Sequence, residues 1–228
     1  MVIDRRRCGP GGIGEMKQVI MGLGVLICTV GCHTGNGDSY YEDQEHFRFD
    51  AGAQDAPEAV PELPLFVDEW FGPSGYMGDG EDGLVESSPC PARPSTGQGT
   101  CHRFTWTPGD QGWAGVFWQF PDGNWGTAGG LSIPNGARTV RFTAWGDTGT
   151  EVVSFGVGMG DVDGFSAELD AVSLTDTPTE YVIDLSEVNY GDVVGGFVWT
   201  CDQMGAELVF YIDEIRWDTQ PFTEQELE

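Results

Sequence analysis

Short apolar runs that alternate with polar residues recur along this chain, and glycine, proline, aspartate and asparagine separate them. No stretch of ten residues between 63 and 219 has the 3.6-residue periodicity of an amphipathic helix, whereas a period of two is typical of a half-buried strand. The pattern therefore favours an all-β fold, a two-sheet antiparallel β-sandwich of the jelly-roll type. The predicted strands are 65–71, 102–107, 112–120, 137–145, 152–159, 180–185, 195–201 and 208–217.

The composition divides the chain into four parts. Residues 63–219 hold the predicted strands and are numerous enough to bury the core of one domain. Residues 33–62 are rich in Gly, Asp, Glu, Gln, Ala and Pro, so we expect a flexible acidic linker. Residues 220–228 form a short acidic tail, and residues 1–32 are set apart as an export signal.

The export signal is predicted from the segment that ends at Cys32. Met16 and Lys17 precede an apolar run over 19–31, which is shorter than the roughly 20 residues that span a bilayer. A basic start, an apolar run, a small residue and then cysteine together resemble the signal of bacterial lipoproteins. The resemblance implies that Cys32 is lipid-modified and that the chain is exported and anchored at the bacterial outer membrane or cell surface. A simple secretory signal cut between 31 and 34 is the alternative, and Met1 and Met16 are both candidate translation starts.

The charge beyond Cys32 is one-sided. This part of the chain has six arginines, no lysine and thirty-five carboxylates, which gives a formal charge of about −29. Nucleic acid is excluded as a natural partner because phosphate binding needs a basic surface. The same charge keeps the protein soluble and favours divalent cations, and we expect a monomer.

Three cysteines remain in the predicted domain. A segment rich in proline and glycine separates Cys90 from Cys101, and a disulfide between them would close this loop in an exported protein. Cys201 would then be a buried thiol. Pairing of Cys201 with either of the other two is the alternative, and no Cys/His spacing suggests a zinc site.

Residues 112–126 hold three of the eight tryptophans, interleaved with glycine, amides and acids. Aromatic rings beside such groups can accept the apolar face of a sugar while the polar groups bond its hydroxyls. Strand alternation places Trp118 on the core face and Trp113 on the opposite face, whereas Trp125 falls on a turn. The predicted ligand-binding residues are Tyr76, Trp113, Trp118, Gln119, Asp122, Asn124 and Trp125.

Two segments resemble the galactose-binding-like β-sandwich of carbohydrate-binding modules. They are the closing strand Val209-Phe210-Tyr211-Ile212-Asp213-Glu214-Ile215-Arg216-Trp217 and the acidic strand followed by an aromatic and Gly-rich loop over 67–79. The resemblance implies a non-catalytic domain that binds a polysaccharide or another glycan. It also implies a structural calcium between the first and last strands, for which carboxylates supply hard oxygen ligands. The candidate ligands are Asp68, Asp213, Asp79 and Asp82.

Two other functions compete with this hypothesis. A glycoside hydrolase or another carbohydrate-active enzyme on a jelly-roll fold would use a pair of carboxylates, and reducing-sugar release would reveal it. A Ser/His/Asp arrangement is disfavoured because His102 is the single histidine of the predicted domain and no Gly-x-Ser-x-Gly is present. A surface adhesion lipoprotein would use the aromatic patch to bind a protein partner, which soluble oligosaccharides would not displace.

Overall fold

A computed structural model describes residues 60–223, apart from 88–89, 91–92, 94–96 and 203–206. The predicted export signal with Cys32, nearly all of the predicted linker and residues 224–228 lie outside the described residues. All described residues belong to one compact unit.

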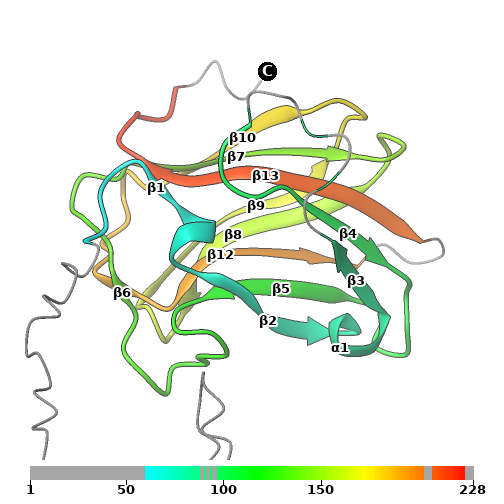
Figure 1. Ribbon diagram of the computed structural model, residues 1–228, viewed down its shortest axis with the longest axis horizontal. Coiled ribbons are helices and arrows are strands. Elements are labelled where there is room, and N and C mark those ends of the chain that lie inside the picture. The colour runs from blue at the N-terminus through cyan, green and yellow to red at the C-terminus, as the bar shows by residue number, and fades with distance from the viewer. Residues whose placement is uncertain (1–59, 88–89, 91–92, 94–96, 203–206, 224–228) are drawn as a thin grey trace, which may run out of the picture. The chain divides into compact units, whose positions relative to one another are not determined.

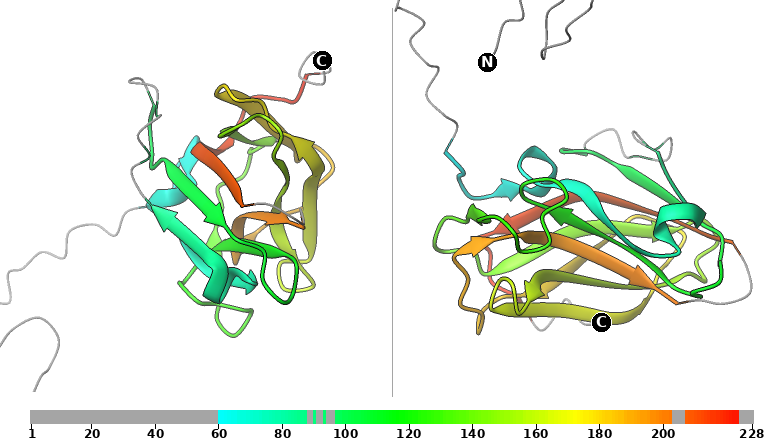
Figure 2. Two further views of the ribbon diagram at one scale, coloured as in Figure 1. Left: turned by 90° about the vertical axis from the view of Figure 1, so that its right-hand side faces the viewer. Right: turned by 90° about the horizontal axis from the view of Figure 1, so that it is seen from below.

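Two antiparallel sheets face each other and form a β-sandwich, which confirms the predicted fold class (Figures 1 and 2). The first sheet has the strand order β10-β7-β13-β4-β3, with β1 paired to β13. Its strands are β10 (Thr179–Asp184), β7 (Thr139–Gly146), β13 (Leu208–Asp218), β4 (His102–Trp106), β3 (Leu84–Ser87) and β1 (Leu65–Phe66).

The second sheet has the strand order β2-β5-β12-β8-β9. Its strands are β2 (Gly72–Gly78), β5 (Ala114–Gln119), β12 (Gly195–Cys201), β8 (Val152–Gly160) and β9 (Phe165–Ser173). A separate short pair joins β6 (Leu131–Ser132) to β11 (Asp192–Val193). Strands β2 and β3 therefore lie at the edges of opposite sheets, and the single helical turn α1 (Gly80–Gly83) connects them along the chain (Figure 1).

Large aromatic side chains from both sheets fill the space between them. Phe104 of β4 lies 4.9 Å, between ring centroids, from Trp199 of β12, and Trp199 lies 4.9 Å from Phe210 of β13. All three are fully buried, as alternation along each strand requires when one face meets the core.

The structure corrects the sequence prediction at the start of the domain. The predicted strand 65–71 ends at Phe66, and a 3-10 turn, η1 (Val67–Glu69), follows it. The segment expected to be a Gly-rich loop is instead the edge strand β2, whose glycines and proline hide it from propensity-based prediction. An edge position tolerates such residues because only one side of the strand carries ladder hydrogen bonds.

The cysteine predictions are confirmed. A disulfide joins Cys90 to Cys101, with the two Cα atoms 5.5 Å apart, and Cys201 is a buried free thiol. Burial raises the pKa of the Cys201 thiol to about 12, so it stays protonated and unreactive at neutral pH. In the described part of the chain, no helix is long and apolar enough to cross a membrane.

Candidate ligand-binding site

Asn124 organises the loop between β5 and β6. Its side chain is buried, and its amide nitrogen donates to the carbonyls of Phe120 and Ala128 at 2.9 and 3.1 Å. Its side-chain oxygen accepts from the backbone N–H groups of Gly126, Thr127 and Ala128 at 3.0, 3.0 and 3.1 Å. These bonds use both amide hydrogens of Asn124, so this residue shapes the loop and has no donor left for a ligand.

Gln119 ties the same loop to the edge strand β2. It is completely buried, its amide nitrogen donates to the Asn124 carbonyl at 2.9 Å, and its oxygen accepts from the Ser74 hydroxyl at 3.1 Å. The Ser74 hydroxyl in turn accepts from the Gly123 N–H at 2.9 Å. Gln119 therefore holds the loop from inside the protein, and because it is buried it cannot contact a bound ligand.

Trp125 projects from this anchored loop toward solvent. Its residue surface is 48% exposed, and its ring meets Phe117 edge to face with 6.2 Å between centroids. Trp125 lines a pocket of about 400 Å³ together with Ser74 and Tyr76 of β2, Gly80 of α1 and Leu84 of β3. Two predicted ligand residues, Trp125 and Tyr76, thus meet in one pocket at the edge shared by the two sheets.

Tyr76 is fixed in this pocket by a charged network that runs into the core. Its hydroxyl donates to Glu86 of β3 at 3.0 Å, and the other oxygen of Glu86 accepts from Nδ1 of His102 at 2.6 Å. Nε2 of His102 donates to Asp68 at 2.9 Å, and the same oxygen of Asp68 accepts from Nε1 of Trp118 at 2.8 Å. The network connects the two sheets at the edge that carries the pocket.

His102 carries a positive charge in this network. Burial alone would lower its pKa, but the hydrogen bonds and charges of Asp68 and Glu86 outweigh burial and raise the pKa to about 9. Burial and the adjacent Glu86 carboxylate raise the pKa of Tyr76 to about 12, so its hydroxyl remains a donor at neutral pH. Because that hydrogen is donated to Glu86, the Tyr76 hydroxyl can only accept a hydrogen bond from a ligand in the pocket.

The remaining predicted ligand residues lie outside the residues that line this pocket. Trp118 is completely buried in the core, where alternation placed it, so it cannot contact a ligand. Trp113 is 37% exposed, but its ring lies against Gly78, where an added Cβ would come within 2.8 Å of the indole. Asp122 is exposed, with its carboxylate against Gly72.

The carboxylates predicted as calcium ligands each bond donors of their own. Asp213 is 1% exposed and holds the guanidinium of Arg93 at 2.9 and 3.1 Å, while Asp68 accepts from His102 and Trp118. Burial raises the pKa of Asp213 above its ordinary value despite the opposing effect of Arg93. These two carboxylates do not fit a shared divalent cation, because a cationic side chain already occupies each of them.

Asp79 has a structural role in the described chain. Its carboxylate accepts from the backbone N–H groups of Gly109, Gln111 and Gly112, each at 2.9 Å. Desolvation raises the pKa of Asp79, but these donors outweigh it and hold the pKa below its ordinary value. The side chain of Asp82 lies outside the description, and among described residues no group of three or more His, Cys, Asp and Glu is arranged to hold a metal ion.

Sequence reasoning missed the polar surroundings of Tyr76. Ser74, Leu84 and Glu86 belong to the edge strands β2 and β3, neither of which was predicted. The available signal was His102, the single histidine of the predicted domain, placed at the start of a predicted strand. A histidine on an apolar face needs a polar partner, and here it has two.

Several solved structures are similar to this chain. One is the family 11 carbohydrate-binding module of a cellulosomal cellulase of Clostridium thermocellum, at 14% identity and a TM-score of 0.46, covering 73% of this chain and 99% of that one. A family 30 carbohydrate-binding module matches at 12% identity and a TM-score of 0.45, covering 64% of this chain and 92% of that one. A variant of a family 29 module matches at 15% identity and a TM-score of 0.36, covering 68% and 94%. No protein-family model and no curated protein matches the sequence.

Proposed function

We propose that this protein is a non-catalytic carbohydrate-binding protein and that a sugar ring stacks on Trp125. The observation that carries the proposal is an indole 48% exposed on a hydrogen-bonded loop, above a pocket of about 400 Å³. The apolar face of a sugar packs well on an aromatic ring. A ring that is already held in place loses little conformational entropy on binding. The Ser74 and Tyr76 oxygens line the same pocket, and although both donate their hydrogens within the protein, each can still accept from a sugar hydroxyl.

The polar network behind the pocket supports binding rather than catalysis. Both ring nitrogens of His102 donate to carboxylates, and the residue is 3% exposed. A charged imidazole has no lone pair with which to take a proton, so His102 does not serve as a general base in this arrangement. A glycoside hydrolase would instead use a pair of carboxylates, and reducing-sugar assays on a polysaccharide panel test for it; the non-catalytic proposal expects no release.

The test is retention on insoluble glycans of a panel, measured for Trp125→Ala. Loss of a stacked ring is worth about 1 to 2 kcal/mol, which is roughly tenfold in affinity. Trp113→Ala is the matched control, because it removes an exposed tryptophan that does not line the pocket. Retention that survives Trp125→Ala but falls with Trp113→Ala would refute the site. Binding that soluble oligosaccharides do not displace would favour a protein partner.

We further propose an exported protein that acts as a monomer at the bacterial outer membrane or cell surface, anchored by a lipid on Cys32. The sequence of residues 16–32 supports this part of the proposal. Metabolic labelling with a fatty acid tests it, since Cys32→Ser should abolish incorporation of the label. Cys201→Ser, which changes a buried thiol, is the control and should leave labelling intact.

A further inference from the structure

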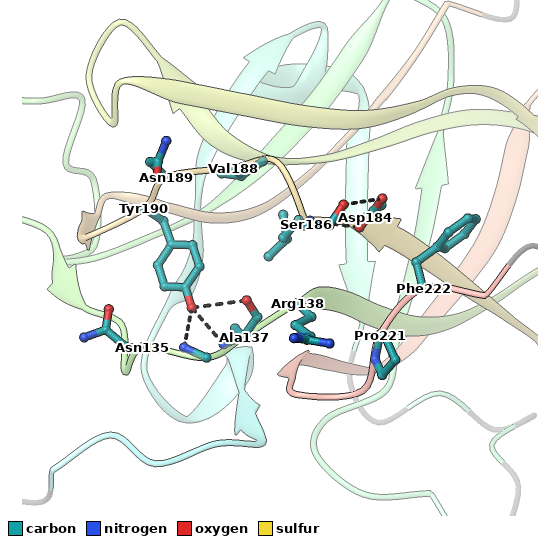
Figure 3. Close-up of a pocket in the computed structure, with 12 residues that line it drawn as sticks. Asn135, Ala137, Arg138, Asp184, Ser186, Val188, Asn189, Tyr190, Pro221 and Phe222 are labelled. Atoms are coloured by element: carbon teal, nitrogen blue, oxygen red, sulfur yellow. Dashed lines mark hydrogen bonds between the residues drawn. The ribbon is translucent and has the colours of Figure 1, made fainter.

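A second pocket, of about 510 Å³, lies between the start of β7, the end of β10 and the segment that follows β13 (Figure 3). We propose that it binds an acidic sugar unit, one that carries a carboxylate or a sulfate ester, and that Arg138 is the partner of the anionic group. The proposal rests on the proposed function in that the ligand is a saccharide, but it concerns a site separate from Trp125. The lining residues that carry the argument are Asn135, Arg138, Asp184, Asn189, Tyr190 and Phe222.

Arg138 is unusual among the arginines of the described chain. Arg93 pairs with Asp213, Arg141 and Arg216 pair with Glu180, and Arg103 donates to Thr105. The exposed Arg138 side chain makes no hydrogen bond or ion pair with any described residue.

A guanidinium that pairs with no described residue is notable in a chain with such an excess of carboxylates. Its planar group presents donors in a fork that matches a carboxylate or sulfate with two parallel hydrogen bonds. Because Arg138 is exposed and lines a pocket of ligand size, its donors are available to an anion from solution.

Asp184 lines the same pocket without neutralising Arg138. No ion pair within 4.0 Å joins them, and the two oxygens of Asp184 accept from the N–H and the hydroxyl of Ser186, each at 2.9 Å. The pocket thus holds a cation and an anion apart. A ligand that bears only an anion would meet Asp184 unfavourably, whereas the hydroxyls of a sugar can donate to it.

Tyr190 is held in place in this pocket by contacts within the protein. The Tyr190 hydroxyl accepts from the N–H groups of Gly136 and Ala137 at 3.0 and 2.7 Å, and its ring packs edge to face on Trp217 at 5.3 Å. Figure 3 draws Tyr190 and Phe222 at opposite ends of the pocket, with Arg138 between them. The pocket has rings at its ends, the exposed amides of Asn135 and Asn189, and the Arg138 guanidinium, which no described side chain pairs. These groups match a flat, hydroxylated ligand with one negative group.

The experiment compares three trisaccharides by titration calorimetry at about 0.15 M salt, which screens the net negative charge of the chain. The probes are trigalacturonate, a sulfated galactose trisaccharide and the neutral galactose trisaccharide. Arg138→Gln should weaken binding of the acidic probes by at least about tenfold. Arg103→Gln removes the same charge outside the pocket and should change binding by less than about twofold. Binding of trigalacturonate alone, of the sulfated probe alone or of both supports the site and identifies the anion.

Three outcomes would overturn the proposal. They are no binding of either acidic probe to the native protein, acidic binding that survives Arg138→Gln, and acidic binding lost in Trp125→Ala but kept in Arg138→Gln. Chemical-shift changes on addition of trigalacturonate give a second measurement that needs no variant, and they should fall on the Asn135 and Asn189 side-chain amides. Retention of neutral glycans that depends on Trp125, together with binding of the acidic probes that Arg138→Gln leaves unchanged, would refute this inference and leave the first pocket standing.

Discussion

The charge on His102 should make the stability of the protein depend on pH in the alkaline range. The folded-state pKa of His102 is about 9 against an ordinary value of 6.5, a difference worth roughly 3 kcal/mol at 1.36 kcal/mol for each pH unit. Because the folded pKa is raised, this contribution is fully present below about pH 6.5. It declines as the pH rises and is lost once the pH passes about 9.

The measurement is urea unfolding of the full chain at pH 6.5, 7.5, 8.5 and 9.5, followed by tryptophan fluorescence. The free energy of unfolding should fall by roughly 3 kcal/mol over this range, since the carboxylates titrate below it. Tyr76 does not interfere, because its pKa of about 12 lies above the range. Trp118 shares Asp68 with His102, so its fluorescence reports on the same network.

His102→Gln is the control that assigns the effect. The variant should be less stable than the native protein at pH 6.5, and its profile should be nearly flat up to pH 8.5. Above pH 8.5 it should keep only the smaller decline caused by the Cys201 thiol, whose pKa of about 12 in the folded protein means that it ionises first in the unfolded chain. His33 and His46 remain in the variant, so any slope they cause would persist. A native stability that rises toward pH 9.5, or a slope that is unchanged in His102→Gln, would refute the assignment of a charged His102.

Three further outcomes are expected from the contacts, and a fourth measurement addresses calcium. Asn124→Ala should lower the free energy of unfolding by about 2 kcal/mol and weaken glycan retention, since several backbone groups of the loop lose their partner. Unchanged glycan retention by the folded variant would contradict the role of Asn124 in shaping the loop. Replacing Cys90 and Cys101 by serine should cost about 2 to 3 kcal/mol in urea unfolding, and no loss would contradict the contribution of the short closed loop. Arg93→Ala should lower the free energy of unfolding by about 2 kcal/mol because the Asp213 carboxylate is left buried without its cation. The loss should shrink at low pH, where Asp213 is protonated. Thermal unfolding in calcium and in EDTA tests the predicted structural calcium; the observed ion pairs favour no difference, and a higher midpoint in calcium would support that metal.

Strand alternation was sufficient to predict the β-sandwich and to place core residues, even in a strand that carries tryptophans on both faces. Alternation in 112–120 predicted that Trp118 points into the core, and the residue is completely buried. Prediction failed for β2, because its glycines and proline have low strand propensity and an edge strand needs only one neighbour. The pocket could not be located for the same reason, since it lies between this strand and β3, which was also missed.

Two of the predicted ligand-binding residues are amides, Gln119 and Asn124, whose side chains bond groups within the protein. An amide that bonds a sugar hydroxyl and an amide that bonds a backbone carbonyl have the same chemistry, so residue type alone cannot separate Gln119 and Asn124 from ligand-contacting residues. What separates them is the turn itself. A loop that reverses direction over 120–128 leaves backbone groups without ladder partners, and a buried asparagine is the residue that can satisfy several of them at once. Once Asn124 is committed inward, the ring beside it has no core to join, which is why Trp125 reaches solvent and a pocket forms beneath it.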